Sequence, residues 1–164
     1  MNKSDCFESE RLCYRGITDQ DADCLVRWRS TDQLIRYFKN PEPLTLQGHR
    51  AWFINSYLHN TFRYDYVIAE KASQTRIGTI GVSNLDYHKK SCVLSYMIAV
   101  KAYQRRGFAG EAIVAMMERV KREGIEVFIA EIHQDNIASL GTVEKLGFLQ
   151  YSQEGNFLLF RYVR

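Results

Sequence analysis

The sequence LSYMIAVKAYQRRGFAGEAIVAMMERVKRE, residues 94–123, combines three features that together indicate one kind of fold. Apolar and β-branched residues open it as a strand, and a polar, glycine-bearing turn follows at residues 104–110. Apolar residues then recur every three or four positions, which predicts a helix. A helix that starts directly after such a turn presents free backbone N–H groups at the positive end of its dipole. The turn is therefore predicted to bind an anion such as a phosphate group.

The turn differs from two common phosphate-binding motifs. A nucleotide P-loop requires Lys followed by Ser or Thr at the start of the helix, where this chain has Glu111 and Ala112. The dinucleotide fingerprint requires a third glycine, whereas this turn contains Gly107 and Gly110. Neither kind of nucleotide site is therefore predicted.

The composition is that of an ordinary globular protein. The 164 residues are 46% hydrophobic and 25% charged and fit one domain, 1–164. The formal net charge of +3 is too small to indicate a nucleic-acid partner. Lys101, Arg105 and Arg106 instead gather positive charge at the turn, where a small anionic ligand would suffice.

Membrane association and metal binding are not expected either. No apolar run approaches the roughly 20 residues that span a bilayer, and the N-terminus has no signal-peptide hydrophobic region, so a cytoplasmic protein is expected. The four cysteines have neither Cys-x-x-Cys spacing nor a paired histidine motif, so no zinc site and no disulfide framework are expected.

The order of elements predicts a mixed α/β fold with one central sheet. Strands are predicted at 11–15, 64–70, 76–83, 92–100, 126–133 and 157–163, with 148–151 leading into the last one. Helices are predicted from Thr18 to about Ser30, then at 32–38, 46–59 and 136–146, besides the helix after the turn. The sheet is expected to contain about six or seven strands flanked by helices.

Two motifs resemble the signatures of the GNAT acetyltransferase superfamily. Gln104, Gly107 and Ala109 match its Gln-x-x-Gly-x-Ala motif in the expected strand-to-helix setting. The segment NIASLGTVEKLGF, residues 136–148, is similar to the second signature, Asn-x-x-Ser followed by Glu-Lys-x-Gly-Phe. The two blocks and the order of elements extend the resemblance over nearly the whole chain.

The resemblance implies a GNAT fold in which the predicted strands 92–100 and 126–133, the fourth and fifth, splay apart. Acetyl-CoA would lie in the gap as co-substrate, with its pantetheine arm in place of a missing strand and its pyrophosphate on the amides of the turn. The backbone groups of the fourth strand would pair with that arm. The residues so assigned to acetyl-CoA are Met97, Ile98, Val100, Gln104, Arg105, Arg106, Gly107, Phe108, Ala109, Gly110, Asn136 and Ser139.

Within the superfamily, the chain is similar to the Rim-type ribosomal-protein N-terminal acetyltransferases, the polyamine acetyltransferases and the nucleotide-amino-sugar N-acetyltransferases of the pseudaminic acid type. Its N-terminal pattern most resembles the amino-sugar members, which implies a nucleotide-linked amino sugar as acceptor. The residues so assigned to the acceptor are Trp28, Arg29, His49 and Trp52. Aromatic residues at helical spacing more often belong to a hydrophobic core than to a sugar-binding surface.

Acetyl transfer to an amine requires a general base, because an alkylammonium group has a pKa of roughly 10. Glu131 is the predicted base, since strand alternation puts it on the same face as His133 and Rim-type enzymes carry their base glutamate at the matching place. It equally fits a strand-end carboxylate paired with a nearby Lys or Arg. His133 is an alternative base or relay, and Tyr96, Asp86 and Glu70 are lesser candidates.

The leaving thiolate requires a proton or a hydrogen bond. Many GNAT members supply it from a tyrosine, but the corresponding position in this chain is Val143. Ser139, water or the proton of the incoming amine could take over this role. A backbone N–H at the bulged fourth strand, near Ile98, is expected to meet the charge that develops on the thioester oxygen.

Several functions remain open at this level. The acceptor could also be a protein N-terminus or a polyamine, although a polyamine site should be rich in carboxylates and residues 27–50 are predominantly basic. Because Val143 stands where many GNAT members have a tyrosine, the chain could also be a non-catalytic module that binds acyl-CoA. The chain could act as a monomer or a homodimer.

Overall fold

The computed structural model describes residues 1–163, and Arg164, the last residue of the predicted domain, lies outside the described residues. One eight-stranded mixed sheet forms the centre, in the order β1-β2-β3-β4-β5-β6-β8-β7. Its strands are β1 (Cys6–Glu8), β2 (Leu12–Gly16), β3 (Tyr64–Glu70), β4 (Arg76–Asp86), β5 (Ser91–Ile98), β6 (Val127–His133), β7 (Leu149–Glu154) and β8 (Phe157–Val163). The predicted α/β fold with one central sheet is confirmed, with β1 and β7 in addition to the six predicted strands.

The α-helices are α1 (Ala22–Arg29), α2 (Asp32–Ile35), α3 (Leu46–Trp52), α4 (Phe108–Lys121) and α5 (Ile137–Lys145). A π-helical turn, Phe53–Tyr57, continues α3 in place of the single longer helix that was predicted. The predicted helix at 32–38 is shorter in the structure. Tyr37 N–H donates to Leu34 O and Phe38 N–H donates to Ile35 O, three residues back in each case, so the chain tightens after Ile35.

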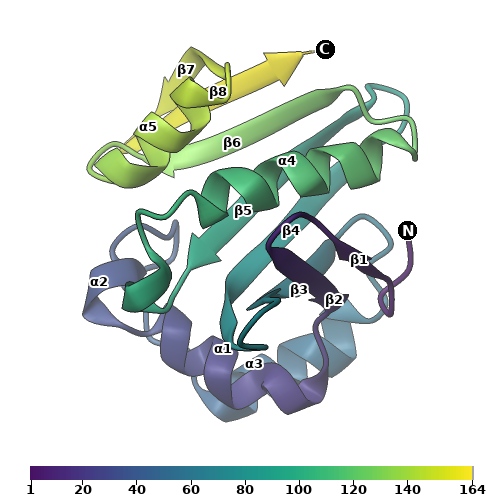
Figure 1. Ribbon diagram of the computed structural model, residues 1–164, viewed down its shortest axis with the longest axis vertical. Coiled ribbons are helices and arrows are strands. Elements are labelled where there is room, and N and C mark those ends of the chain that lie inside the picture. Colours follow the sequence, from purple (N-terminus) through teal and green to yellow (C-terminus); the bar gives the residue numbers. More distant parts are fainter. Residues whose placement is uncertain (164) are drawn as a thin grey trace.

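Helices cover both faces of the sheet, with α4 and α5 on one face and α1 to α3 on the other (Figure 1). Strand β3 shows how the sequence assigns the faces. Tyr66 and Ile68 pack in the main core with Met116 of α4, whereas Val67 between them packs in a second core with Trp28 of α1. This alternation is the two-residue period of a strand that is buried on both faces.

A buried carboxylate fixes the start of α1. Thr18 N–H donates to Asp21 Oδ2 at 2.9 Å, which confirms the predicted helix start. The fully buried Asp21 side chain also pairs with Arg15 at 2.7 Å and Arg76 at 3.1 Å, and so joins α1 to β2 and β4. Burial by itself raises the pKa of Asp21, but hydrogen bonds from Arg15 and Thr18 outweigh it and lower the pKa to about 2.

Candidate active site

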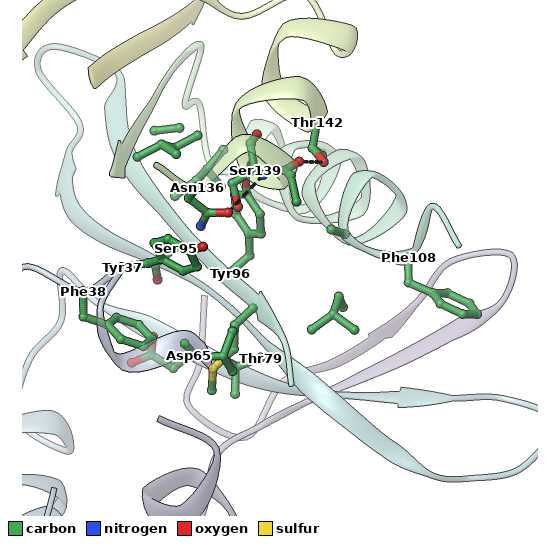
Figure 2. Close-up of a pocket in the computed structure, with 18 of the residues that line it drawn as sticks. Tyr37, Phe38, Asp65, Thr79, Ser95, Tyr96, Phe108, Asn136, Ser139 and Thr142 are labelled. Carbon is green, nitrogen blue, oxygen red and sulfur yellow. Dashed lines mark hydrogen bonds between the residues drawn. The ribbon is translucent and has the colours of Figure 1, made fainter. Parts of the chain in front are cut away.

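The pairing of β5 with β6 stops part-way along both strands. The last parallel pair is Leu94 with Ala130, although β5 continues to Ile98 and β6 to His133. Strand β6 stays paired with β8 along its whole length. The predicted splay is therefore confirmed, and we call the point where the strands part, after Leu94 and Ala130, the fork. A groove of about 2480 Å³ opens there and is lined by residues from both faces of the sheet (Figure 2).

The turn before α4 forms one wall of the groove. Gly107 has φ +81°, in the left-handed region that favours glycine, and α4 begins at the next residue. Because Glu111 N–H donates to Gly107 O, the amides of Phe108, Ala109 and Gly110 have no partner within residues 1–163. Three free amides at the positive end of a 14-residue helix suit the pyrophosphate of coenzyme A.

A bulge at the end of β5 decides which backbone groups face the gap. The N–H groups of Ala99 and Val100 both donate to Ile77 O, at 2.8 and 3.2 Å. A Cβ added at Gly78 would lie 2.0 Å from Met97 O, so the Met97 carbonyl also faces β4. Since successive residues of a strand point their backbone groups to opposite sides, those of Ile98 face the gap.

The first turn of α5 forms the opposite wall. Asn136 Oδ1 accepts a hydrogen bond from Ser139 N–H at 3.3 Å, and Tyr96 Oη donates to Ser139 O at 3.4 Å (Figure 2). The Ser139 backbone is thus held from two sides, while its hydroxyl has no hydrogen-bond partner in the described chain. Burial raises the pKa of Tyr96 to about 12, which makes Tyr96 a hydrogen-bond donor rather than a base.

Glu131 is the first residue of β6 beyond the fork. Its neighbours Ala130 and Ile132 belong to the main core under α4 and α5, so Glu131 points to the opposite face, toward α1 to α3. Glu131 Oε2 lies 2.6 Å from Lys39 Nζ, and the two side chains are 26% and 55% exposed. Both predicted roles of Glu131, the groove carboxylate and the partner of a lysine, thus coincide.

His133 lies on the same face, two residues further along β6. Its Nδ1 accepts a hydrogen bond from Asp135 N–H at 3.2 Å, which leaves Nε2 to carry the proton in the neutral ring. Its ring centroid is 6.0 Å from that of Tyr37 and 5.4 Å from that of Phe157. His133 is therefore held by aromatic contacts at the margin of the groove.

Arg29, at the end of α1, reaches the acceptor side of the groove without a carboxylate partner. Its Nε is buried and has no hydrogen-bond partner among residues 1–163, and its guanidinium lies 4.7 Å from the ring centroid of Phe38. Burial and the neighbouring charge of Arg63 lower the pKa of Arg29. Arg63 is itself paired with Asp65 at 2.6 Å. A half-buried arginine that has an unpaired N–H group and no carboxylate partner is suited to bind an anion.

The two tryptophans assigned to the acceptor have different environments. His49 and Trp52 of α3 line the groove, with their ring centroids 5.3 Å apart. Burial and the nearby Arg29 lower the pKa of His49, which favours its neutral form. Trp28 packs in the second core, on the buried side of α1, and is not among the groove residues. Its contact with the acceptor stays a prediction.

The comparisons with known proteins agree with this geometry. Residues 11–149 match the family model described as acetyltransferase (GNAT) domain. The chain belongs to the GNAT acetyltransferase family. GNAT enzymes use acetyl-CoA, and this membership makes the chain an acetyl-CoA-dependent acyltransferase domain.

Two curated proteins are similar to the chain in sequence. The uncharacterised N-acetyltransferase YoaA of Bacillus subtilis is 28% identical over 145 residues, which are 87% of this chain and 81% of that protein. An uncharacterised protein of Methanocaldococcus jannaschii is 25% identical over 144 residues, 86% of this chain, and the chain spans 28% of its length.

The structures share the fold at low identity. RimL, a ribosomal L7/L12 α-N-protein acetyltransferase solved with coenzyme A, has a TM-score of 0.83 at 15% identity and covers 97% of this chain and 98% of its own. The microcin C7 self-immunity acetyltransferase MccE, solved with acetyl-CoA and AMP, has a TM-score of 0.78 at 15% identity, over 95% and 94% of the two chains.

Most residues assigned to acetyl-CoA by the GNAT resemblance line the groove, and two do not. Those in the groove are Met97, Ile98, Gln104, Arg105, Gly107, Phe108, Ala109, Gly110, Asn136 and Ser139. Val100 has its amide bound to Ile77 O and its carbonyl bound by Tyr103 N–H. The Arg106 guanidinium lies over the rings of Tyr103 and Phe108, at 5.4 and 5.2 Å, outside the groove. Contact of the groove residues with acetyl-CoA stays a prediction.

Three other residues that the sequence analysis considered do not line the groove. Val143, at the GNAT tyrosine position, is 0% exposed and packs in the main core. Asp86 accepts hydrogen bonds from the N–H groups of His88 and Lys89 in a turn, and Glu70 accepts them from Ser73. Neither carboxylate lines the groove, so neither can serve as the base.

Sequence reasoning missed several residues around the site. Glu111 accepts hydrogen bonds from Ser9 Oγ at 2.6 Å and from the backbone N and Nε of Arg11, both at 2.7 Å. These bonds join the loop between β1 and β2 to the first turn of α4. Lys39 and Asp65 also line the groove. Asp65 carries a weak signal, as the one charged residue in the otherwise apolar strand YDYVIA; Lys39 carries none.

Within residues 1–163, no group of three or more His, Cys, Asp or Glu side chains is placed to hold a metal ion. The four cysteines are free thiols. Across the described helices, none is long and apolar enough to cross a membrane.

Proposed function

We propose that this GNAT domain transfers the acetyl group of acetyl-CoA to the primary amine of an acceptor that also carries an anionic group, and that the acceptor is a nucleotide-linked amino sugar. The observation that carries the proposal is the position of Glu131 at the fork. It is the first residue of β6 beyond the pairing with β5, and it faces the side of the sheet that Arg29 reaches.

The donor would enter from the face covered by α4 and α5. The amides of Phe108 to Gly110 would hold its pyrophosphate, and the backbone of Ile98 would pair with its pantetheine arm. Gln104 Nε2 donates to Ile98 O at 2.8 Å, so the groove side of that carbonyl is already polar. In this arrangement the thioester would lie at the fork.

The chain's own groups would then divide the proton transfers. Glu131 takes a proton from the acceptor ammonium, and the neutral amine attacks the thioester carbonyl directly, without a covalent enzyme intermediate. The N–H of Ile98 is placed to stabilise the negative charge on the carbonyl oxygen. The attacking nitrogen loses its second proton to the departing thiolate, and the Ser139 hydroxyl, free of other partners, donates a hydrogen bond to the sulfur or relays that proton in place of the tyrosine absent at Val143.

The charges on the acceptor side favour an anionic acceptor over a polyamine. Asp65 is paired with Arg63, Glu131 is the base that the reaction itself uses, and Asp135 lies at the margin of the groove beside His133, whereas Arg29 has an unsatisfied Nε. A polycation would find few carboxylates for its further amines, but a phosphate would meet Arg29. The structure of MccE with acetyl-CoA and AMP is a precedent, in another protein, for a nucleotide on this fold.

Thiol release from acetyl-CoA would test the proposal. The acceptors are a nucleotide-linked amino sugar, the same amino sugar without its nucleotide, a polyamine and N-terminal peptides. Glu131→Gln is compared with Glu126→Gln, because Glu126 also pairs with an exposed lysine, Lys90, at 2.8 Å but outside the groove. We expect turnover of the nucleotide sugar, reduced about 100-fold or more in Glu131→Gln and unchanged in the control.

Each other result has a defined meaning. Equal rates for Glu131→Gln and the wild type would remove Glu131 from the mechanism. Turnover of polyamines or peptides alone would replace the acceptor class. If acetyl-CoA binds and no amine is acetylated, the domain is a non-catalytic acyl-CoA-binding module.

A further inference from the structure

A lysine of the chain occupies the position in which the acceptor amine has to react. Lys39 lies in the loop between α2 and α3, and its Nζ is 2.6 Å from Glu131 Oε2. The same Nζ is 5.8 Å from the ring centroid of Phe157, on the strand next to β6. Lys39 therefore brings a primary alkyl amine to the proposed base, at the fork between β5 and β6.

This ion pair can open at little cost. The Lys39 side chain is 55% exposed, and an ion pair with an exposed partner contributes little to stability. The amine is also the same nucleophile that the proposed reaction uses. Once Glu131 removes its proton, the Nζ lone pair is available at a base that is already in contact with it.

Lys39 differs from the other lysines of the chain in this respect. Lys101 and Lys145 also line the groove, but neither has an ion pair with a carboxylate in the described residues. Lys90 has a carboxylate partner, Glu126 at 2.8 Å, but lies outside the groove. Lys39 alone among these four combines a position in the groove with a bound carboxylate.

We propose that Lys39 is an acceptor in its own right, so that the domain acetylates itself at Lys39 Nζ when no external amine is bound. This inference rests on the proposed function. The Nζ lone pair forms a bond to the carbonyl carbon of acetyl-CoA, and the C–S bond breaks. One proton of the Lys39 ammonium goes to Glu131 before the attack, and the second passes from Nζ to the departing thiolate, directly or through Ser139 or water. The products are Nε-acetyl-Lys39 and free coenzyme A.

Two consequences follow from the geometry. Transfer occurs within one molecule, so its rate should not depend on protein concentration. An external acceptor that binds beside Glu131 must displace Lys39, so a saturating acceptor should protect the lysine. Each molecule reacts once, because the acetylated amine stays attached to the chain.

The test is incubation of the full chain with acetyl-CoA alone, followed by intact mass measurement and peptide mapping over time. We expect one acetyl group, on Lys39, added at least about tenfold faster than on Lys90, with a first-order rate that is independent of protein concentration. Glu131→Gln should slow the reaction about tenfold or more, and Glu126→Gln should not. In Lys39→Arg the fast modification should be absent.

The alternative outcomes separate the two proposals. Turnover of an external amine with Lys39 modified no faster than Lys90 would overturn self-acetylation and keep the proposed function. A rate that rises with protein concentration would also overturn it, because the transfer would then be between molecules or purely chemical. Modification of Lys39 without turnover of any external amine would support self-acetylation and reject the proposed acceptor.

Discussion

Replacing Arg29 by methionine should weaken recognition of an anionic acceptor without destabilising the fold. Arg29 has a buried Nε with no partner in the described chain, and its guanidinium packs on Phe38. Methionine is unbranched and flexible, so it can retain most of that packing. The substitution removes the charge and leaves the shape of α1 nearly unchanged.

The expected changes in kcat/KM and in Tm follow from the hydrogen bond that Arg29 would make to an anion and from the one that its Nε lacks in the free protein. A hydrogen bond to a charged group contributes about 1.5–3 kcal/mol, which corresponds to roughly 10- to 150-fold in kcat/KM for an anionic acceptor. An unsatisfied buried donor costs about 1–3 kcal/mol, and we take about 1 because Arg29 is half-buried. Relief of that cost should raise Tm by about 2–4 °C for a domain of this size.

The assay compares kcat/KM for a nucleotide-linked amino sugar and for the same sugar without its nucleotide, together with thermal unfolding. Arg27→Met is the matched control, because Arg27 lies on the same helix and is exposed. We expect Arg29→Met to lose activity toward the charged acceptor only, and Arg27→Met to change neither measurement. A variant that is less stable and loses activity equally toward both acceptors would refute the reasoning, since Arg29 would then be a structural cation.

Three further predictions concern the turn, the thiolate and the buried carboxylate. Gly107→Ala and Gly124→Ala should each lower the free energy of unfolding by about 1–2 kcal/mol, because both glycines have positive φ. Of the two, only Gly107→Ala should raise KM for acetyl-CoA in steady-state kinetics. Ser139→Ala should lower kcat about tenfold with little change in KM for acetyl-CoA, whereas Ser152→Ala on the exposed strand β7 should have no effect. The pKa of Asp21 is lowered from 3.8 to about 2, so its carboxylate stabilises the fold above pH 3.8 by about 2 kcal/mol. That stability should disappear as the pH falls toward 2 in denaturant unfolding of the wild type, and Asp21→Asn should lack this pH dependence.

The donor side could be predicted from sequence because its features are local. The Gly107 turn, the start of α4 and the cap at Asn136 each depend on residues within a few positions of one another. The position of Glu131 followed from the two-residue period of β6. Where the backbone alone sets the geometry, a motif is enough to place the residue.

The bulge of β5 was expected only from the resemblance to GNAT enzymes, because the residues of the strand do not indicate it. One extra residue opposite Ile77 changes the side to which every later amide points, and no residue type in Ala99 or Val100 signals it. The helical spacing of the two tryptophans does not reveal their environments, for a related reason. Trp28 and Trp52 carry the same local signal, and only the packing of α1 and α3 against the sheet distinguishes a core residue from a groove residue.

Lys39 shows the limit most clearly, because its partner is 92 residues away along the chain (131 minus 39). Its position depends on where the loop after α2 lies over β6, which propensity does not determine. A carboxylate at the fork would otherwise meet no cation on its own strand, since β6 contains no lysine or arginine. The pairing therefore arises from the tertiary structure, and the proposed self-acetylation arises with it.

The fork itself explains why donor and acceptor meet there. Beyond Leu94 and Ala130 the two strands lack each other's hydrogen bonds, and unsatisfied backbone groups cost about 1–3 kcal/mol each when buried. An extended ligand with its own amide groups, such as a pantetheine arm, can supply those bonds. Because β6 remains paired with β8, only its β5 side is open, and Glu131 is held on a rigid strand at the end of that opening. In the proposed function, the break in one ladder thus provides the donor site, and Glu131, on the other face of the same strand, provides the carboxylate that an acceptor amine requires.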